Sequence, residues 1–447
     1  MSRPPRPRRS RVVAGAGKLR VGVAGIGTVG GGLIKLFADD NARLNERLTL
    51  TAISARNRTR KRDVDILRYQ WFDDPVELAS HPDIDVFVEL IGGSDGPAKR
   101  AVEIALKRGA HVVTANKALL AIHGAHLAGL SEQHGGKLLF EAAVGGGVPV
   151  VKAMKESLAG CRVKALSGIL NGTCNYLLTE MEASGRSFED VLADAQRLGY
   201  AEADPTMDVG GFDAAHKITI LAAIAFGARP DFEHVKIEGV DVVTLHDIRL
   251  AGKLGYRIKL IAKAERIGDA VSAHVRPALL AFDHPLANVG GALNALVADA
   301  DPVGQLTFIG RGAGEGPTAS AVAADLLDIA EGRGGPAFGR PLNQLASAAR
   351  AAPAERGRFY MRLLVQDRPG VVAAVSDRLA HENVSIESFL QMPSYEAPIV
   401  PIVLTTQSCA RAALDAAAAA IESLDAVTEP PRVMPIEDSG GRSRFWS

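Results

Sequence analysis

A glycine-rich loop near the start of the chain constrains the fold more than any other feature of the sequence. The strand-type run Lys18–Ala24 leads into Gly25-Ile-Gly27-Thr-Val-Gly30, and a helix with apolar spacing, Val29–Phe37, follows directly. Glycines at these positions permit a tight turn and the close approach of a pyrophosphate, which the helix N-terminus then stabilises. A plain glycine-rich turn could carry the same motif, but a strand before it and a helix after it favour a dinucleotide-binding loop.

Strand-type and helical segments alternate after this loop. Such alternation predicts a parallel, doubly wound sheet. We therefore expect an α/β protein whose residues 18–150 form a Rossmann-type NAD(P)-binding domain. Its further strands are expected at Leu48–Ser54, Val86–Ile91, Val112–Thr114 and from Leu138 onwards.

The pattern changes after residue 150, and two further domains are expected. Residues 151–335 combine longer helices with amphipathic strands, as in an α+β catalytic and dimerisation domain, and the helix at 318–335 is expected to pack back on the first domain. A linker rich in Gly, Pro and Ala follows at 336–355. Residues 356–437 then show the order βαββαβ of a ferredoxin-like unit, with a basic tail (1–17) and a second tail (438–447) at the two ends.

Composition excludes several classes of protein. Lys plus Arg and Asp plus Glu both number 51, so the net charge indicates neither a nucleic-acid nor a membrane partner. Three cysteines without CxxC spacing argue against a zinc site or a disulfide framework, and no apolar run reaches the length of a membrane span. The basic, Pro-broken start excludes a secretory signal; a transit peptide is conceivable, but a disordered tail is favoured. The expected location is the cytoplasm.

The end of the second predicted strand indicates which dinucleotide binds. An NAD-dependent domain usually places an acid there to hold the ribose 2′-hydroxyl, but this chain has no acid before Asp63. It continues instead with four arginines, Arg56, Arg58, Arg60 and Arg62. A cationic cluster suits the 2′-phosphate of NADP(H), and Arg56 is its best-placed member. We therefore expect NADP(H) to be preferred over NAD(H), with a solvated basic loop as the alternative.

Residues 202–217 carry a second concentration of functional side chains. Asp213 and Lys217 are four residues apart in a run that indicates a helix, so both lie on one face of it. Three carboxylates, Glu202, Asp204 and Asp208, precede them in a loop that contains Pro and Gly. Together these charges suit a small, cationic, hydroxyl-bearing substrate, although an Asp–Lys pair at this spacing is more often a surface salt bridge.

Seven motifs, taken in order, resemble the homoserine dehydrogenase family, and the resemblance extends over roughly residues 18 to 436. They are Gly25-Ile-Gly-Thr-Val-Gly30, Glu89-Leu-Ile-Gly-Gly93, Thr114-Ala-Asn-Lys117, Glu141-Ala-Ala-Val-Gly145, Gly168-Ile-Leu-Asn-Gly-Thr173, Gly211-Phe-Asp213-x-x-x-Lys217 and Gly310-Arg-Gly-Ala-Gly314. The resemblance implies the interconversion of L-aspartate 4-semialdehyde and L-homoserine with NAD(P)H, on the route to threonine, methionine and isoleucine.

The same resemblance implies roles for particular residues. Lys217 would be the general acid/base, Asp213 its orienting partner, and Glu202 the residue that holds the substrate, with Asp208 as a further substrate contact. Lys117 matches a lysine near the nicotinamide and the reacting oxygen. Cofactor contacts are expected at Gly25, Gly27, Thr28, Val29, Gly30, Arg56, Ser94, Lys117 and Gly314. A structural Na⁺ (or K⁺) would be held by Glu141 and the backbone carbonyls of Val144, Gly146 and Val148.

The C-terminal unit resembles an ACT domain, which implies inhibition by L-threonine. In such domains an effector site often forms between paired subunits, at positions that correspond here to Asp367–Gly370 and Asn383. A homodimer is the family expectation, or a tetramer through pairing of the ACT domains.

Several alternatives stay open. Asp204 and Asp208 could hold substrate or could equally cap the next helix. His216 is expected to be packed or exposed, because at helical spacing it faces away from Lys217. An aspartate-semialdehyde dehydrogenase would need a cysteine nucleophile with a partner base, for which Cys161 and Cys174 are poorly placed in sequence. A non-enzymatic alternative is an NADP-binding, amino-acid-sensing regulator without turnover.

Overall fold

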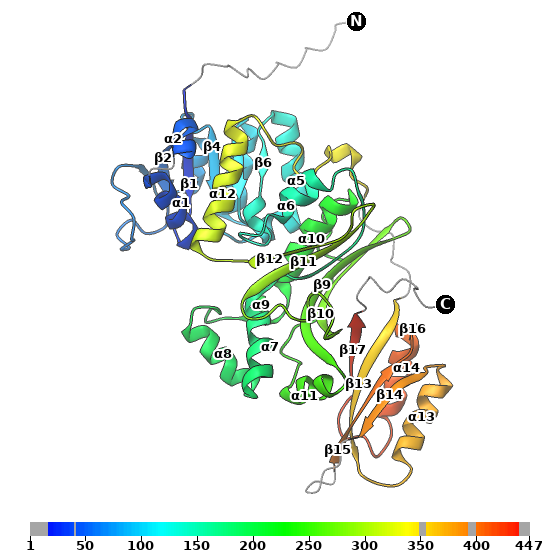
Figure 1. Ribbon diagram of the computed structural model, residues 1–447. Coiled ribbons are helices and arrows are strands. Elements are labelled where there is room, and N and C mark those ends of the chain that lie inside the picture. Colours follow the sequence, from blue (N-terminus) through cyan, green and yellow to red (C-terminus); the bar gives the residue numbers. More distant parts are fainter. Residues whose placement is uncertain (1–16, 40–41, 348–354, 392–398, 438–447) are drawn as a thin grey trace, which may run out of the picture. The chain divides into compact units, whose positions relative to one another are not determined.

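The computed structural model describes residues 17–39, 42–347, 355–391 and 399–437 (Figure 1). The chain divides into two compact units. The first comprises residues 1–162, 216–233 and 310–348, and the second comprises 163–215, 234–309 and 349–447. The second tail, nearly all of the basic tail and part of the expected linker lie outside the described residues.

A six-stranded sheet forms the centre of the first unit. Its strands run parallel in the order β3-β2-β1-β4-β5-β6, which is the strand order of dinucleotide-binding Rossmann folds and confirms the predicted fold class. The strands are β1 (Leu19–Ala24), β2 (Leu48–Ser54), β3 (Gln70–Phe72), β4 (Val86–Glu89), β5 (His111–Thr114) and β6 (Leu138–Leu139). The sequence pattern missed β3, because a three-residue strand is too short to show alternation.

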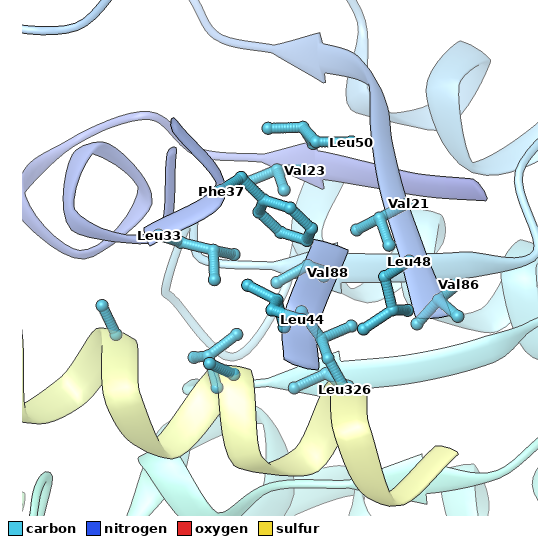
Figure 2. Close-up of a cluster of buried hydrophobic side chains, with 14 of the residues drawn as sticks. Val21, Val23, Leu33, Phe37, Leu44, Leu48, Leu50, Val86, Val88 and Leu326 are labelled. Atoms are coloured by element: carbon cyan, nitrogen blue, oxygen red, sulfur yellow. The ribbon is translucent and has the colours of Figure 1, made fainter. Parts of the chain in front are cut away.

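A helix from far along the chain completes the core of this unit. Helix α12 (Glu315–Ala330) buries Val322, Leu326 and Ile329 in one apolar cluster with residues of β1, β2 and β4. Figure 2 shows Leu326 next to Leu44 in this cluster. The other helices of the unit are α1 (Thr28–Ala38), α2 (Ala42–Arg47), α3 (Pro75–Ser80), α4 (Pro97–Lys107), α5 (Lys117–His134) and α6 (Val150–Lys152).

One mixed sheet of eleven strands runs through the second unit. Its main path is β12-β11-β7-β9-β10-β17-β13-β15-β14. The strands before residue 312 are β7 (Arg162–Ile169), β8 (Lys236–Ile237), β9 (Tyr256–Ile267), β10 (Ala270–Ala281), β11 (Leu293–Asp301) and β12 (Gly304–Arg311). Strand β11 was not predicted, because its Ala and Asp residues are poor strand formers. The helices here are α7 (Gly172–Ser184), α8 (Phe188–Arg197), α9 (Thr206–Val209) and α11 (Leu245–Lys253), while α10 (Phe212–Phe226) continues into the first unit.

The C-terminal segment has the predicted βαββαβ order. It consists of β13 (Arg356–Gln366), α13 (Val371–His381), β14 (Ile386–Gln391), β15 (Ile399–Thr406), α14 (Arg411–Glu422) and β17 (Arg432–Glu437), with a short β16 (Cys409–Ala410). Residues of both helices and of β13 and β15 share one apolar core, including Met361, Leu379 and Leu404. This arrangement confirms the ferredoxin-like fold. Asn383, which was expected at an effector site, has a φ of 56° and forms the left-handed turn after α13.

The C-terminal unit shares its sheet with the rest of the second unit. Strand β17 pairs in parallel with β10, where Leu280 is the register partner of Glu437. Buried ion pairs reinforce the junction: Lys263 Nζ lies 2.8 Å from a Glu437 carboxylate oxygen. On α11, the fully buried carboxylate of Asp247 lies 2.6 Å from Arg362 Nε on β13. The ferredoxin-like unit is therefore built into the sheet, and its removal would take away these partners of Lys263 and Asp247.

We expect the substitution Glu437→Gln to lower the Tm by about 5 °C or more, because breaking a buried ion pair costs about 3–5 kcal/mol. Burial alone would raise the pKa of Glu437, but the adjacent His274 and Lys263 hold this pKa well below its ordinary value of 4.5. A lowered carboxyl pKa stabilises the fold above the ordinary pKa and loses that contribution as the pH falls. The difference in Tm between variant and wild type should therefore be largest near neutral pH and shrink in acid.

The matched control for this measurement is Asp415→Asn, which breaks an exposed ion pair of 2.7 Å with Arg411. Exposed pairs contribute little, so the control should shift the Tm by about 1 °C or less. Equal shifts in thermal unfolding of the two variants would contradict the assignment of the junction charges.

Candidate functional site

The glycine-rich loop joins β1 to α1 at the carboxyl edge of the parallel sheet. Gly25 has a φ of +96°, and a Cβ atom there would lie 2.4 Å from the carbonyl oxygen of Leu90. A Cβ atom on Gly30 would lie 2.1 Å from the carbonyl oxygen of Gly25, whereas one on Gly27 would meet nothing within 4 Å. The turn is therefore tight on the side of the sheet and open at the N-terminus of α1, which is where a pyrophosphate binds in this fold. The first residues of α1, Thr28 and Val29, are exposed and half-buried respectively.

The arginine-rich loop after β2 contacts the glycine-rich loop. Arg62 Nε donates to the carbonyl oxygen of Ile26 at 3.3 Å, and Arg62 Nη2 donates to the carbonyl oxygen of Asn57 at 2.8 Å. The Arg58 and Arg62 guanidinium groups each lie 5.8 Å from the ring centre of Trp71. Arg62 thus organises the loop, while the side chains of Arg56, Arg58 and Arg60 are exposed beside the dinucleotide loop.

A buried carboxylate organises the neighbouring loop at the same edge of the sheet. Glu89 ends β4, and its side chain is 0% exposed. One carboxylate oxygen accepts hydrogen bonds from the backbone N–H groups of Ile91 and Gly92, at 2.7 and 2.9 Å. The other accepts a hydrogen bond of 2.6 Å from the Thr114 hydroxyl at the end of β5. Glu89 therefore ties the turn after β4 to the turn after β5.

Asn116 extends this connection to Lys117. Its side-chain oxygen accepts from the backbone N–H of Leu119 and caps α5, whose first residue is the half-buried Lys117. Its amide nitrogen donates to the carbonyl oxygen of Gly93 at 2.7 Å, next to Ser94, whose hydroxyl donates to its neighbour Asp95 at 2.9 Å. The sequence alone assigned no role to Glu89 or Asn116. Glu89 could have been found from its position at the end of a buried strand, shortly before Gly92 and Gly93.

Asp208 and Asp213 come together in the second unit. The side-chain amide of Asn171 donates to a carboxylate oxygen of each, at 2.7 Å for Asp208 and 2.9 Å for Asp213. Asp213 lies in the first turn of α10 and is 5% exposed, and Lys217, one turn later, is 7% exposed. Asp213 and Lys217 are therefore not a solvated surface pair, whereas Asp208 is half-buried.

The other acids of this segment differ in their settings. Asp204 accepts hydrogen bonds from the backbone N–H and the hydroxyl of Thr206, at 3.1 and 2.6 Å, so it shapes the start of α9. Asp208 lies within α9 and not in an open loop. Glu202 is exposed ahead of α9, and its backbone carbonyl accepts from the Gln196 side chain at 3.1 Å. Asp204 therefore hydrogen-bonds the first residue of α9, in line with the helix-capping alternative.

Two further residues of the segment have packing roles. His216 is buried, and its ring stacks on Phe232 with 4.5 Å between ring centres, as expected for a packed histidine. Cys174 is buried in the first turn of α7, and its thiol donates to the backbone carbonyl of Asp208 at 3.1 Å. This contact supports the turn of α9.

The candidate cation ligands lie in the turn after β6. The carboxylate oxygens of Glu141, which is buried, accept from the backbone N–H groups of Val151 and Lys152 at 3.0 and 2.7 Å, and burial raises the pKa of Glu141 to about 7. A Cβ atom on Gly146 would lie 2.5 Å from the carbonyl oxygen of Gly312, so this turn packs on the segment that leads to Gly314 at the start of α12. Carboxylate and backbone carbonyl oxygens, including those of Val144 and Val148, suit a hard cation.

Clusters of metal-binding side chains and membrane-spanning helices are both absent from the described residues. No group of three or more His, Cys, Asp and Glu side chains in the described part of the chain could hold a metal ion. Within the same residues, no helix has the length and apolar character to cross a membrane.

Three family models match successive parts of the chain. Residues 25–141 match the homoserine dehydrogenase NAD binding domain, residues 149–327 match the homoserine dehydrogenase model, and residues 359–426 match the ACT domain. These matches follow the order of the elements described above.

Known proteins resemble the chain over nearly its whole length. The homoserine dehydrogenase of Neisseria gonorrhoeae is 40% identical over 430 residues, which are 94% of this chain and 98% of that protein. A crystal structure of a homoserine dehydrogenase from Thiobacillus denitrificans is similar with a TM-score of 0.88 and 40% identity, over 95% of this chain and 99% of that one. A hyperthermophilic archaeal homoserine dehydrogenase in complex with NADPH matches with a TM-score of 0.61 and 25% identity, over 71% of this chain and 99% of that one.

Proposed function

We propose a reaction and a set of site residues for this protein, on the premise that the chain belongs to the homoserine dehydrogenase family of oxidoreductases. The enzyme reduces L-aspartate 4-semialdehyde reversibly to L-homoserine, on the route to threonine, methionine and isoleucine. One observation carries the proposal. Asp213 and Lys217 are buried one turn apart on α10, and the side-chain amide of Asn171 donates to both Asp213 and Asp208.

Reduction of an aldehyde needs a hydride for the carbonyl carbon and a proton for the alkoxide oxygen that develops. Bound NADPH supplies the hydride. The ammonium group of Lys217 stabilises the alkoxide and delivers a proton to it from Nζ, while Asp213 orients that ammonium. Reduction needs the protonated amine of Lys217 and the oxidation of homoserine needs the neutral amine, so elevated pH favours oxidation.

Acidic residues of the second unit bind the amino-acid end of the substrate. Glu202 and Asp208 receive its ammonium group, since carboxylate oxygens accept charge-assisted hydrogen bonds from a small cation. Lys117, at the start of α5, contributes positive charge for the reacting oxygen. Ser94 and Gly314 contribute contacts to the cofactor.

NADP(H) is the preferred cofactor. Support comes from the exposed arginines beside the glycine-rich loop, and from the archaeal relative that is in complex with NADPH. The remaining assignments follow the family resemblance. Glu141 with the carbonyls of Val144, Gly146 and Val148 holds a structural Na⁺ (or K⁺), the ACT domain binds L-threonine, and the enzyme works as a homo-oligomer in the cytoplasm.

The decisive test of function is the oxidation of NADPH with L-aspartate 4-semialdehyde as substrate, with and without L-threonine. We expect turnover that depends on the aldehyde and falls when threonine is added. Binding of NADPH without any turnover would instead favour the non-enzymatic regulator. Turnover that threonine leaves unchanged would contradict the assignment of the effector alone.

For Lys217→Ala we expect kcat to fall by about 100-fold or more while NADPH binding is retained, because the proton donor is lost and the dinucleotide loop is unchanged. The matched control is Lys107→Ala, which removes an exposed lysine that lies 3.5 Å from Glu103 on α4. Steady-state kinetics and fluorescence titration with NADPH measure both effects. A near-normal kcat in Lys217→Ala would refute the assignment.

The substitution Arg56→Ser should raise the KM for NADPH by about tenfold and leave the KM for NADH nearly unchanged, because only NADPH carries the 2′-phosphate. Arg68→Ser is the control, since it removes an exposed arginine that lies over Tyr69 further along the same loop. Wild-type enzyme with equal kcat/KM for the two cofactors would contradict the proposed preference.

A further inference from the structure

We propose that Asn171 is a positioning residue, which holds the carboxylates of Asp208 and Asp213 side by side through hydrogen bonds from one neutral amide. The inference rests on the proposed function, because it assigns one of these acids to the substrate ammonium and the other to Lys217. It adds a residue that touches neither the substrate nor the cofactor.

Every polar group of the Asn171 side chain is engaged. Its oxygen accepts a hydrogen bond of 2.7 Å from the backbone N–H of Cys174 and so caps α7. Because a backbone N–H can only donate, this contact fixes which end of the amide is oxygen, and it directs the NH₂ group to the two carboxylates. The side chain is 4% exposed, so water does not compete for these hydrogen bonds from open solvent.

The choice of an amide here has a chemical reason. Two carboxylates held close together repel each other, and the repulsion favours the uptake of a proton by one of them. A lysine or arginine between them would remove the repulsion but would also neutralise the charge that a cationic substrate needs. A neutral amide donates one hydrogen bond to each carboxylate and favours both ionised forms without adding a charge of its own.

Asp208 has further contacts with the start of α7. The Thr173 hydroxyl lies 3.4 Å from its second carboxylate oxygen, and the Cys174 thiol donates to its backbone carbonyl. The first turn of α7 thus fixes both the backbone and the carboxylate of Asp208. Asn171 is the member of this turn that also reaches Asp213, 42 residues further along the chain.

The experiment must separate positioning from helix capping. Asn171→Ser and Asn171→Asp both keep a good N-cap, but neither keeps the NH₂ donor, and the aspartate adds a third carboxylate. The matched control is Ser187→Ala, which removes the N-cap of the neighbouring helix α8, where the Ser187 hydroxyl accepts from the backbone N–H of Asp190 at 3.2 Å. The control should lower the Tm and leave the kinetics unchanged.

Steady-state kinetics with NADPH and L-aspartate 4-semialdehyde between pH 5.5 and 9 provide the first readout. In the wild type, KM for the aldehyde should rise in acid as the acids take up protons. In both Asn171 variants this rise should begin at a pH higher by about one unit, because a lost donor and an added carboxylate each favour protonation. At neutral pH, kcat/KM should fall by about tenfold in Asn171→Ser and further in Asn171→Asp.

A readout without turnover keeps the inference separate from the proposed function. The ¹³C signals of the Asp208 and Asp213 carboxyl carbons should titrate at higher pH in both Asn171 variants than in the wild type. If the wild type shows no turnover but the carboxyl titrations still shift to higher pH in the variants, the proposed reaction fails and the positioning role stands. Unchanged carboxyl titrations, or an unchanged pH dependence of KM in active variants, would overturn the positioning role.

Discussion

Buried carboxylates that accept hydrogen bonds from uncharged donors hold the functional loops of this protein in place. Glu89 is held by two backbone N–H groups and a hydroxyl, Glu141 by two backbone N–H groups, and the pair Asp208 and Asp213 by one amide. A buried anion is tolerated only where such donors replace its lost water. The donors are neutral, and the loops that supply them are fixed by the same hydrogen bonds.

The buried acids at the junction of the ACT domain with the rest of its sheet have charged instead of neutral partners. There the buried acids are paired with full positive charges, Glu437 with Lys263 and Asp247 with Arg362. Such pairs stabilise one arrangement of the strands and leave little charge to bind anything else. An uncharged donor therefore contacts Asp208 and Asp213 beside α7, whereas charged donors contact Glu437 and Asp247.

The sequence analysis succeeded where a residue acts through local backbone geometry and failed where it acts through a distant partner. The glycine-rich loop, the parallel sheet and the βαββαβ unit follow from short-range patterns, which survive without knowledge of contacts. Asn171 could not be found in this way, because its partners Asp208 and Asp213 lie 37 and 42 residues away. Asp204 and Asp208 looked equivalent in the sequence, and only the packing of α9 against α7 separated a turn-forming acid from one held beside Asp213.

The return of α12 to the first sheet has a consequence for synthesis of the protein. The apolar cluster that includes Val21 and Val88 is incomplete until Val322, Leu326 and Ile329 are available. A domain usually folds as its residues leave the ribosome, but this one must wait for a segment near residue 330. The core of the dinucleotide-binding domain is therefore complete only after most of the second unit has been made.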